Sequence, residues 1–233
     1  MSSLLLLLQA HGAYLLDEGF SRRREYEVIV SEISSCRKCP LHRYRKNTVP
    51  GEGPLDASVM VVGEAPGRRE DEEGRPFVGA AGKLLDALLE LAGLSRGAVY
   101  ITNIVKCRPP GNRDPKEEEI EACIPYLLRQ IALIKPKLVI AVGRHAARTL
   151  YRLAGLQWTS MTRLHGRLVD AKLAGVSVKI IATYHPAAAL YKPPLRRVLE
   201  DDFKGPIKRA VELALGLRGE RRAGSLLDFL GQS

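Results

Sequence analysis

Short apolar segments alternate with longer segments of helical periodicity along the middle of the chain. Four runs rich in β-branched residues predict strands: 58–62, 98–105, 138–142 and 176–183. The segments that follow them carry apolar residues at helical spacing and predict helices: 79–92, 115–134, 144–153 and 194–217. Because strands alternate with helices, we expect an α/β fold, a three-layer α/β/α sandwich around a mainly parallel four-stranded sheet.

The chain is expected to form one domain, because no long Pro/Gly/Ser-rich linker divides its middle. We place this domain at residues 31–217. Residues 1–30 are expected to form an N-terminal helical extension. Residues 218–233 begin with a charged, glycine-rich segment and are expected to form a flexible C-terminal tail.

Composition favours an intracellular protein, and the charge makes nucleic acid the first candidate among polyanionic partners. The formal net charge is +10, so the summed field attracts polyanions. The Leu4–Leu8 run is too short to span a bilayer, and the residues before it lack the positive charge of a secretory signal. We therefore expect a cytoplasmic location and no membrane partner. The chain has only three Asn and four Gln residues, which deamidate when hot, and this favours a thermophilic prokaryote as source.

Polar residues follow three of the predicted strands, where the functional loops of such a sheet lie. Gly63–Gly67 (Gly-Glu-Ala-Pro-Gly) follows the first strand, Asn103 lies near the end of the second, and His185 follows the fourth. Each has an ordinary alternative: Glu64 as an exposed loop acid, Asn103 as a turn cap, His185 as a core histidine. Because these strand ends meet at one edge of the sheet, we expect the three side chains to converge in an active site.

Two further residues in the same region have more than one reading. Phe77 lies in a polar loop, where it is either a buried anchor or a platform on which a nucleobase stacks. Glu70 begins the acidic run Glu70–Glu73, which is typical of a solvated surface, yet it lies close enough in sequence to enter the site.

The chain has four cysteines: Cys36, Cys39, Cys107 and Cys123. The Cys-Arg-Lys-Cys spacing of the first two lets both thiolates bind one metal or cluster from a tight loop, so we expect the four to share one centre. A set of four cysteines suits zinc and an iron-sulfur cluster equally well, and the spacing leaves both open. A local disulfide between Cys36 and Cys39 is a third alternative.

Four separated motifs occur in order along the chain: Gly63–Glu70, Gly74–Gly79, Thr102–Asn112 and Tyr184–Ala187. Together they resemble the motifs of the family 4 uracil-DNA glycosylases, a thermostable type. The cysteines resemble that family's iron-sulfur ligands in order and approximate spacing, and the resemblance covers roughly residues 35–210. It implies the uracil-DNA glycosylase superfamily fold and a [4Fe-4S] cluster, with these ligands: Cys36, Cys39, Cys107 and Cys123.

The resemblance also implies a reaction. A monofunctional DNA glycosylase flips uracil out of single- or double-stranded DNA and hydrolyses its N-glycosidic bond, which leaves an abasic site and starts base excision repair. The chain lacks a catalytic lysine motif, and this favours a monofunctional enzyme over a lyase.

The resemblance implies roles in base recognition for five residues. Phe77 stacks on the uracil ring, and Asn103 hydrogen-bonds the pairing edge and rejects cytosine. Backbone groups of three consecutive residues line the same pocket: Gly63, Glu64 and Ala65.

The chemical roles implied by the resemblance fall on the loops after the strands. His185 stabilises the negative charge that gathers on the leaving uracil. Glu64 orients or deprotonates water and offsets the positive charge of the sugar, with Glu70 as the second choice. Together with Asn103, these residues form the predicted catalytic set. Leu190 is expected to act as the wedge that fills the gap left by the flipped base.

The C-terminal segment Ser225–Leu230 resembles a peptide that binds a sliding clamp. In such peptides an aliphatic residue and a later hydrophobic pair plug an apolar pocket, here Leu226, Phe229 and Leu230. The usual leading glutamine is replaced by Ala223. A tail docked on its own domain is the alternative reading.

Two other functions compete with the glycosylase. A non-catalytic iron-sulfur DNA-binding protein of the same fold would have no reason to retain Glu64, Asn103 and His185 together. A hydrolase of small nucleotides is disfavoured by the basic charge and by the absence of a Gly-rich phosphate loop with lysine.

Overall fold

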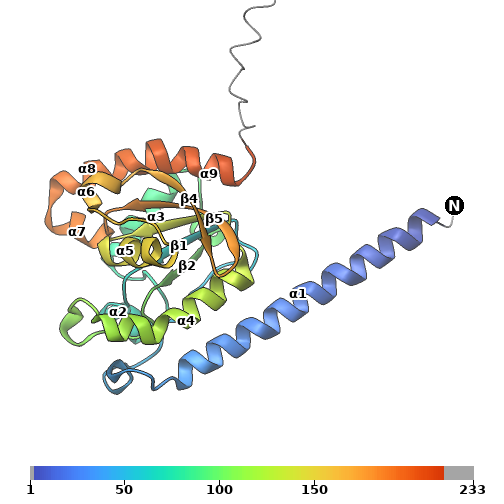
Figure 1. Cartoon of the computed structure of the whole chain (residues 1–233), viewed down its shortest axis with the longest axis horizontal. Helices are drawn as coiled ribbons and strands as arrows, with labels where there is room; N and C mark the ends of the chain where they lie inside the picture. The colour runs from blue at the N-terminus through green and yellow to red at the C-terminus, as the bar shows by residue number, and fades with distance from the viewer. Residues whose placement is uncertain (1–2, 218–233) are drawn as a thin grey trace, which may run out of the picture.

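A twisted five-stranded sheet of order β2-β1-β3-β5-β4 forms the centre of the protein (Figure 1). The structure is a computed structural model that describes the backbone of residues 3–217 and the side chains of residues 19–217. The strands are β1 (Val59–Gly63), β2 (Tyr100–Asn103), β3 (Leu138–Val142), β4 (Leu168–Leu173) and β5 (Val176–Thr183). The first three and β5 are parallel, whereas β4 runs antiparallel to β5 at one edge.

Helices surround this sheet. The longer ones are α1 (Ser3–Ser35), α3 (Ala80–Leu91), α4 (Glu117–Ile134), α5 (Arg144–Leu153) and α8 (Pro193–Asp202). The shorter α-helices are α2 (Arg68–Glu73), α6 (Met161–Leu164), α7 (Pro186–Tyr191) and α9 (Lys208–Ala214). Single helical turns are η1 (Pro40–Arg43), η2 (Arg96–Ala98), η3 (Pro110–Asn112) and η4 (Phe203–Ile207).

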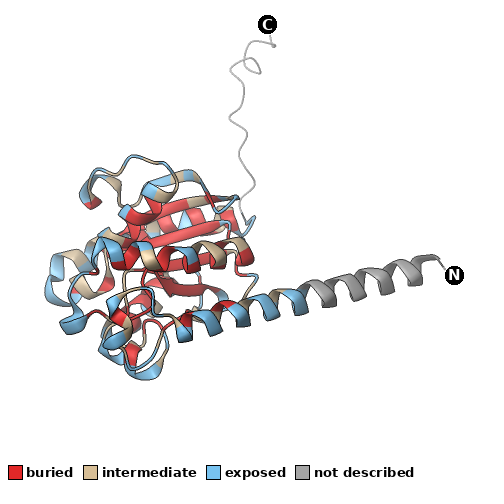
Figure 2. Ribbon diagram, turned by 60° about the horizontal axis from the view of Figure 1, so that its bottom comes forward, coloured by how far each residue is buried: buried red, intermediate tan, exposed pale blue. Residues whose placement is uncertain are grey.

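Alternate residues of each central strand supply two separate cores, one on each face of the sheet. In β1, Met60 and Val62 pack with residues of α4 and α5, whereas Val59 and Val61 pack with residues of α3, α8 and α9. Figure 2 shows the buried strands between these layers of helices. A strand covered on both faces is apolar throughout, as β1 and β3 are. The predicted three-layer α/β/α fold is therefore confirmed.

The prediction of four strands was wrong by one, because β4 was missed. Its residues alternate between exposed and half-buried positions, as expected for an edge strand that lacks a continuous apolar run. The hairpin to β5 turns at Ala174 and Gly175, whose φ angles are 49° and 83°. Two positive φ angles define a type I′ turn, but Ala-Gly is a weaker sequence signal for it than Asn-Gly.

The last predicted helix, 194–217, is not one regular helix. Pro206 has no backbone N–H to donate, and the chain passes through the π-helical turn η4 between α8 and α9. Phe203 and Ile207 of this turn are fully buried in the core that α3 shares. The interruption therefore still presents a continuous apolar face to the sheet.

Helix α1 is anchored to the domain through its last turns. Ile29 and Ile33 pack on Tyr126 and Leu133 of α4, and Figure 1 shows the two helices side by side. The helix continues through Ser35, beyond the predicted end of the extension at residue 30. It thus leads directly into the first cysteine pair.

Two remaining predictions concern the C-terminal tail and the membrane. The sliding-clamp residues Leu226, Phe229 and Leu230 lie outside the described residues. Among the helices that are described, none combines the length and the apolar character needed to cross a membrane.

Candidate active site

A cavity of about 460 Å³ opens at the carboxyl ends of β1, β2 and β5, a size typical of ligand-binding sites. Its lining includes all of the side chains predicted to meet there, together with the runner-up acid: Glu64, Ala65, Glu70, Phe77, Asn103 and His185. The parallel register brings β1 and β2 to the same edge, where Gly63 pairs with Asn103. The predicted convergence of Glu, Asn and His is therefore found in the structure.

Gly63 lets two residues of the cavity wall pack closely, because it has no side chain. A Cβ atom there would lie 2.4 Å from Asn103 Oδ1 and 2.6 Å from Phe77 Cζ. Both distances are far below van der Waals contact, so only glycine lets the amide and the ring approach each other here. Gly63 is not itself among the lining residues, in contrast to Glu64 and Ala65.

Phe77 is held in an unusual backbone conformation. Its φ angle is 51°, a left-handed value that bulky residues rarely adopt. The ring is only 6% exposed and stacks on the His185 imidazole, with ring centroids 5.7 Å apart and planes inclined by 24°. Gly82 of α3 lets the Phe77 carbonyl come close, because a Cβ there would lie 1.7 Å from its oxygen.

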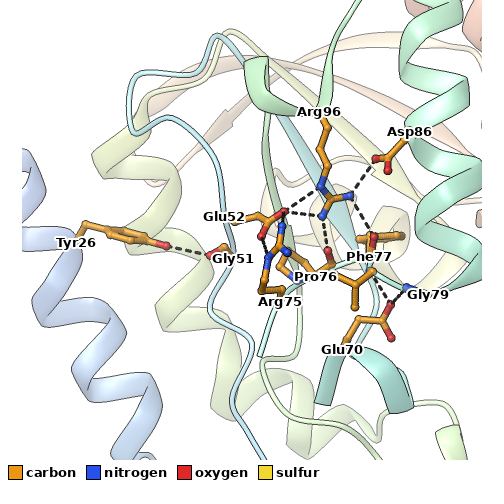
Figure 3. Close-up of polar contacts among 11 residues, drawn as sticks. Tyr26, Gly51, Glu52, Glu70, Arg75, Pro76, Phe77, Gly79, Asp86 and Arg96 are labelled. Atoms are coloured by element: carbon orange, nitrogen blue, oxygen red, sulfur yellow. Dashed lines mark hydrogen bonds and ion pairs between the residues drawn. The ribbon is translucent and has the colours of Figure 1, made fainter. Parts of the chain in front are cut away.

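Hydrogen bonds on both sides hold the Phe77 segment, as Figure 3 shows. On one side Arg96 donates to the carbonyls of Pro76 and Phe77, at 2.5 and 3.1 Å. On the other, Glu70 Oε1 accepts from the amides of Val78 and Gly79, both at 3.0 Å. Glu70 therefore supports the segment through one carboxylate oxygen, although it also borders the cavity.

Arg96 is itself fixed by acidic side chains from two other segments (Figure 3). Its guanidinium contacts Glu52 at 2.6 Å and Asp86 of α3 at 3.0 Å, and Arg75 contacts the same Glu52 at 2.8 Å. The ion pairs raise the pKa of Arg96 despite its burial and lower the pKa of Glu52. A half-buried network with several partners holds its geometry better than an isolated surface pair.

Asn103 lies at the end of β2 with its side chain buried and partly unpaired. The residue is 2% exposed, and its Oδ1 atom has no hydrogen-bond partner. A buried polar atom without a partner costs on the order of 1–3 kcal/mol, so Oδ1 is an unused acceptor on a residue that lines the cavity.

The hydrogen bonds of His185 define its tautomer. Its Nδ1 accepts from the amide of Ala187 at 3.1 Å, which leaves Nε2 to carry the proton of a neutral ring. Burial lowers the pKa of His185 to about 4, partly opposed by Glu70. Gly143 packs against the ring with a φ of 97°, a position that leaves little room for a side chain. His185 is thus a neutral donor at neutral pH.

The pKa of Glu64 is shifted in the opposite direction to that of His185. Burial raises the pKa of its carboxyl, and the neighbouring His145 and Arg144 oppose this shift, whereas Asp114 adds to it. The carboxyl of Glu64 comes within 4.8 Å of both His145 and Asp114. Asp114 in turn contacts His145 at 3.1 Å and Arg144 at 2.7 Å. A carboxylate with a raised pKa is a suitable proton acceptor near neutral pH.

The four cysteines gather at a second, smaller cavity beside α1 and α4: Cys36, Cys39, Cys107 and Cys123. None of the four is in a disulfide, in contrast to the alternative of a Cys36–Cys39 bridge, and Cys107 and Cys123 are buried. Two donors approach their sulfurs: Arg45 Nη1 lies 3.2 Å from Cys107 Sγ, and the Lys106 amide lies 3.3 Å from Cys123 Sγ. Burial raises the pKa of Cys123 to about 12, so ionisation of this group needs a nearby positive centre.

The end of α7 lies at the mouth of the active-site cavity. Leu190 is 46% exposed and its neighbour Tyr191 is 85% exposed, and Tyr191 lines the cavity. Large exposed apolar side chains beside a cavity indicate a contact surface for a partner.

The sequence did not reveal several residues that support the site. Arg96 and Gly82 fix Phe77, while His145 and Asp114 surround Glu64. These residues lie in ordinary helical or loop contexts, and their partners are distant in sequence. Only the Gly-rich context of Gly63 gave a local signal for close packing.

Comparison with known proteins agrees with this geometry. The family model described as the uracil DNA glycosylase superfamily matches residues 50–205. The chain is 54% identical to a type-4 uracil-DNA glycosylase of Pyrobaculum aerophilum, over 73% of this chain and 87% of the relative. It is 51% identical to that of Saccharolobus solfataricus, over 76% and 83%, and 42% identical to that of Thermotoga maritima, over 79% and 94%. The chain therefore belongs to the uracil-DNA glycosylase superfamily and, within it, to the type-4 uracil-DNA glycosylases.

Proposed function

We propose that the protein is a monofunctional uracil-DNA glycosylase that binds a flipped uracil in the cavity at the ends of β1, β2 and β5. The observation that carries this proposal is the buried, unpaired Oδ1 of Asn103 beside Phe77 and His185. The similarity to type-4 enzymes over most of the chain gives independent support. Repair of genomic DNA implies an intracellular location, which forms part of the proposal.

Uracil recognition follows from the pairing edge of the base. The Oδ1 of Asn103 accepts from uracil N3–H, and its Nδ2 donates to O4. Cytosine has an acceptor at N3 and an amine at C4, so it would face the amide with both groups mismatched. Phe77 supplies the apolar face on which the ring stacks, and the backbone at Glu64 and Ala65 closes the pocket. Discrimination thus depends on one rigid amide.

The chemistry separates charge along the glycosidic bond. As the bond between C1′ and N1 breaks, its electron pair leaves with the uracil, and the sugar becomes positive. His185 donates from Nε2 to the uracil oxygen that gains negative charge. Glu64 stabilises the sugar and accepts the proton of the water that adds to C1′. The products are free uracil and an abasic site.

The competing functions lack comparable support. A non-catalytic DNA-binding protein would not need a neutral His185 and a Glu64 with raised pKa at one cavity. A hydrolase of small nucleotides would need groups that bind phosphate, and the sequence has no Gly-rich phosphate loop with lysine.

We further propose that Cys36, Cys39, Cys107 and Cys123 hold a [4Fe-4S] cluster. The fit rests on two features of the site: all four sulfurs border one cavity, and backbone and guanidinium donors reach two of them. Such N–H···S hydrogen bonds stabilise thiolate ligands of clusters. When bound, the cluster would connect the segment after α1, the loop after β2 and helix α4. Hydrolysis of the glycosidic bond transfers no electrons, so its role is structural.

Base flipping requires a residue that fills the vacated space in the duplex, and we propose Leu190 for this role. The expected consequence is selective: Leu190→Ala lowers the rate of uracil release from duplex DNA roughly tenfold, while release from single strands, which leave no gap, stays near wild type. Tyr191→Ala is the matched variant. The same selective loss in Tyr191→Ala, with none in Leu190→Ala, would assign the wedge to Tyr191 instead.

The direct test of the proposed function is incubation with uracil-containing single- and double-stranded DNA, followed by alkaline cleavage. Strand breaks at uracil that appear only after alkali are expected, because a monofunctional enzyme leaves an intact abasic strand. Breaks before alkali would indicate a lyase, and no breaks at all would exclude the glycosylase.

Asn103→Asp tests base recognition. The carboxylate can no longer donate to uracil O4 and can accept from the cytosine amine. The ratio of uracil to cytosine release in single-turnover assays is expected to fall roughly five- to 150-fold, the equivalent of about 1–3 kcal/mol of discrimination. An unchanged ratio would remove Asn103 from the reading role.

An NMR titration of the imidazoles tests the charge state of His185. Since its pKa is lowered to about 4, the ring is expected to stay neutral from pH 8 down to about 5.5, and His185→Gln identifies its signal. The unfolded chain takes up the proton first, near pH 6.5, so the stability that His185 contributes is complete above that pH and is lost as the pH falls toward 4. A midpoint near 6.5 in the folded protein would contradict this assignment.

Absorbance and metal analysis test the cluster. Protein purified without oxygen is expected to be brown, to absorb near ~400 nm and to contain about four irons per chain. Cys123→Ser should lose most of this iron and unfold at a lower temperature. A colourless, zinc-loaded wild-type protein would contradict the assignment.

A further inference from the structure

Lys106 is a lysine buried in the middle of the protein. It is 1% exposed and lies in the loop between β2 and Cys107. Its Nζ is close to three acceptors: Thr102 Oγ1 at 2.5 Å, the Asn103 carbonyl at 2.8 Å and Gln130 Oε1 at 2.7 Å. An ammonium group has three protons, so each can be donated to a different acceptor.

Two of the side chains around Lys106 donate their own protons to other groups, so only their acceptor atoms remain for the lysine. Thr102 donates its hydroxyl proton to the Pro50 carbonyl at 2.7 Å, and so it can only accept from the lysine. Gln130 donates through Nε2 to the same carbonyl and to the Tyr100 hydroxyl, which leaves Oε1 to accept. Every partner of Nζ thus presents a lone pair to it.

This arrangement favours a charged Lys106. A fully hydrogen-bonded buried ion keeps one geometry, because any displacement leaves a group unsatisfied.

Lys106 lies between the two sites. Its side chain bonds the backbone of Asn103, the proposed base-reading residue, and its own amide donates to Cys123 Sγ at 3.3 Å. The next residue in the chain is Cys107. One side chain therefore connects the loop of the cysteine site to the end of β2.

We propose that Lys106 is a positioning residue for uracil recognition: its ammonium fixes the carbonyl of Asn103, and with it the orientation of the Asn103 amide, relative to the cysteine site. The role of Asn103 in base recognition rests on the proposed function, whereas the hydrogen bonds of Lys106 are independent of it. Through this link, a structural change at the cysteine site alters the orientation of the Asn103 amide, even when no residue of the base pocket is substituted.

Lys106→Met tests the proposal, since it keeps the length of the side chain and removes all three hydrogen bonds. In single-turnover assays at a temperature where circular dichroism shows the variant folded, we expect uracil release to fall roughly ten- to hundred-fold, the loss typical of hydrogen bonds to a charged group. The ratio of uracil to cytosine release should fall as well, while affinity for undamaged DNA stays within about twofold.

The matched control is Leu173→Ala. Leu173 is 1% exposed and lies at the β4–β5 turn, at the opposite end of the sheet from the cavity. It is expected to lower the unfolding temperature while leaving uracil release and the base ratio unchanged. A Lys106→Met protein that is less stable but has wild-type release and base ratio would show that Lys106 is only structural, and would overturn the proposal.

A second variant and a second readout keep the test decisive. If Lys106→Met does not fold, Thr102→Val removes a single acceptor and should slow uracil release several-fold; an unchanged rate would overturn the proposal. Hydrogen exchange of the segment 100–106 should accelerate in either variant, whatever the substrate. If the wild-type protein has no glycosylase activity, but exchange still accelerates in the variants, the proposed function is refuted and the structural link through Lys106 is kept.

Discussion

The proposed uracil pocket depends on one strained position, the left-handed backbone of Phe77. A bulky residue adopts this conformation at a cost of about 1–3 kcal/mol and keeps it only where the surroundings impose it. Here Arg96 bonds the carbonyl of Phe77, Glu70 bonds the amides that follow, and Gly82 leaves room for the backbone. This places the ring beside Gly63 and against the His185 imidazole.

Burial then acts on the two ionisable groups of the pocket in opposite directions. It lowers the pKa of His185 to about 4, which keeps the ring neutral, and it raises the pKa of Glu64, which makes the carboxylate more basic. A neutral donor suits the developing charge on uracil, and a basic carboxylate suits water and the positive sugar. In the proposed reaction, burial in one cavity thus prepares both groups for the two ends of the breaking bond.

The sequence was sufficient for the parallel strands and for the loops at their ends, because buried parallel strands are apolar throughout and polar residues directly after them stand out. It was not sufficient for β4, which lacks a continuous apolar run and whose turn is Ala-Gly. Arg96 and Lys106 could not be recognised either, because their roles depend on partners such as Glu52 and Gln130, which lie far away in the chain. Local patterns reveal which segments pack, whereas the partners of a buried charge are set by the tertiary fold.

The most direct test of this account is a crystal structure of the protein with free uracil and abasic DNA. The account predicts that the uracil ring stacks on Phe77, that Asn103 Oδ1 accepts from N3–H, and that His185 Nε2 lies within hydrogen-bond distance of a uracil oxygen. Uracil bound elsewhere, or in this cavity without a contact to the Asn103 amide, would contradict it.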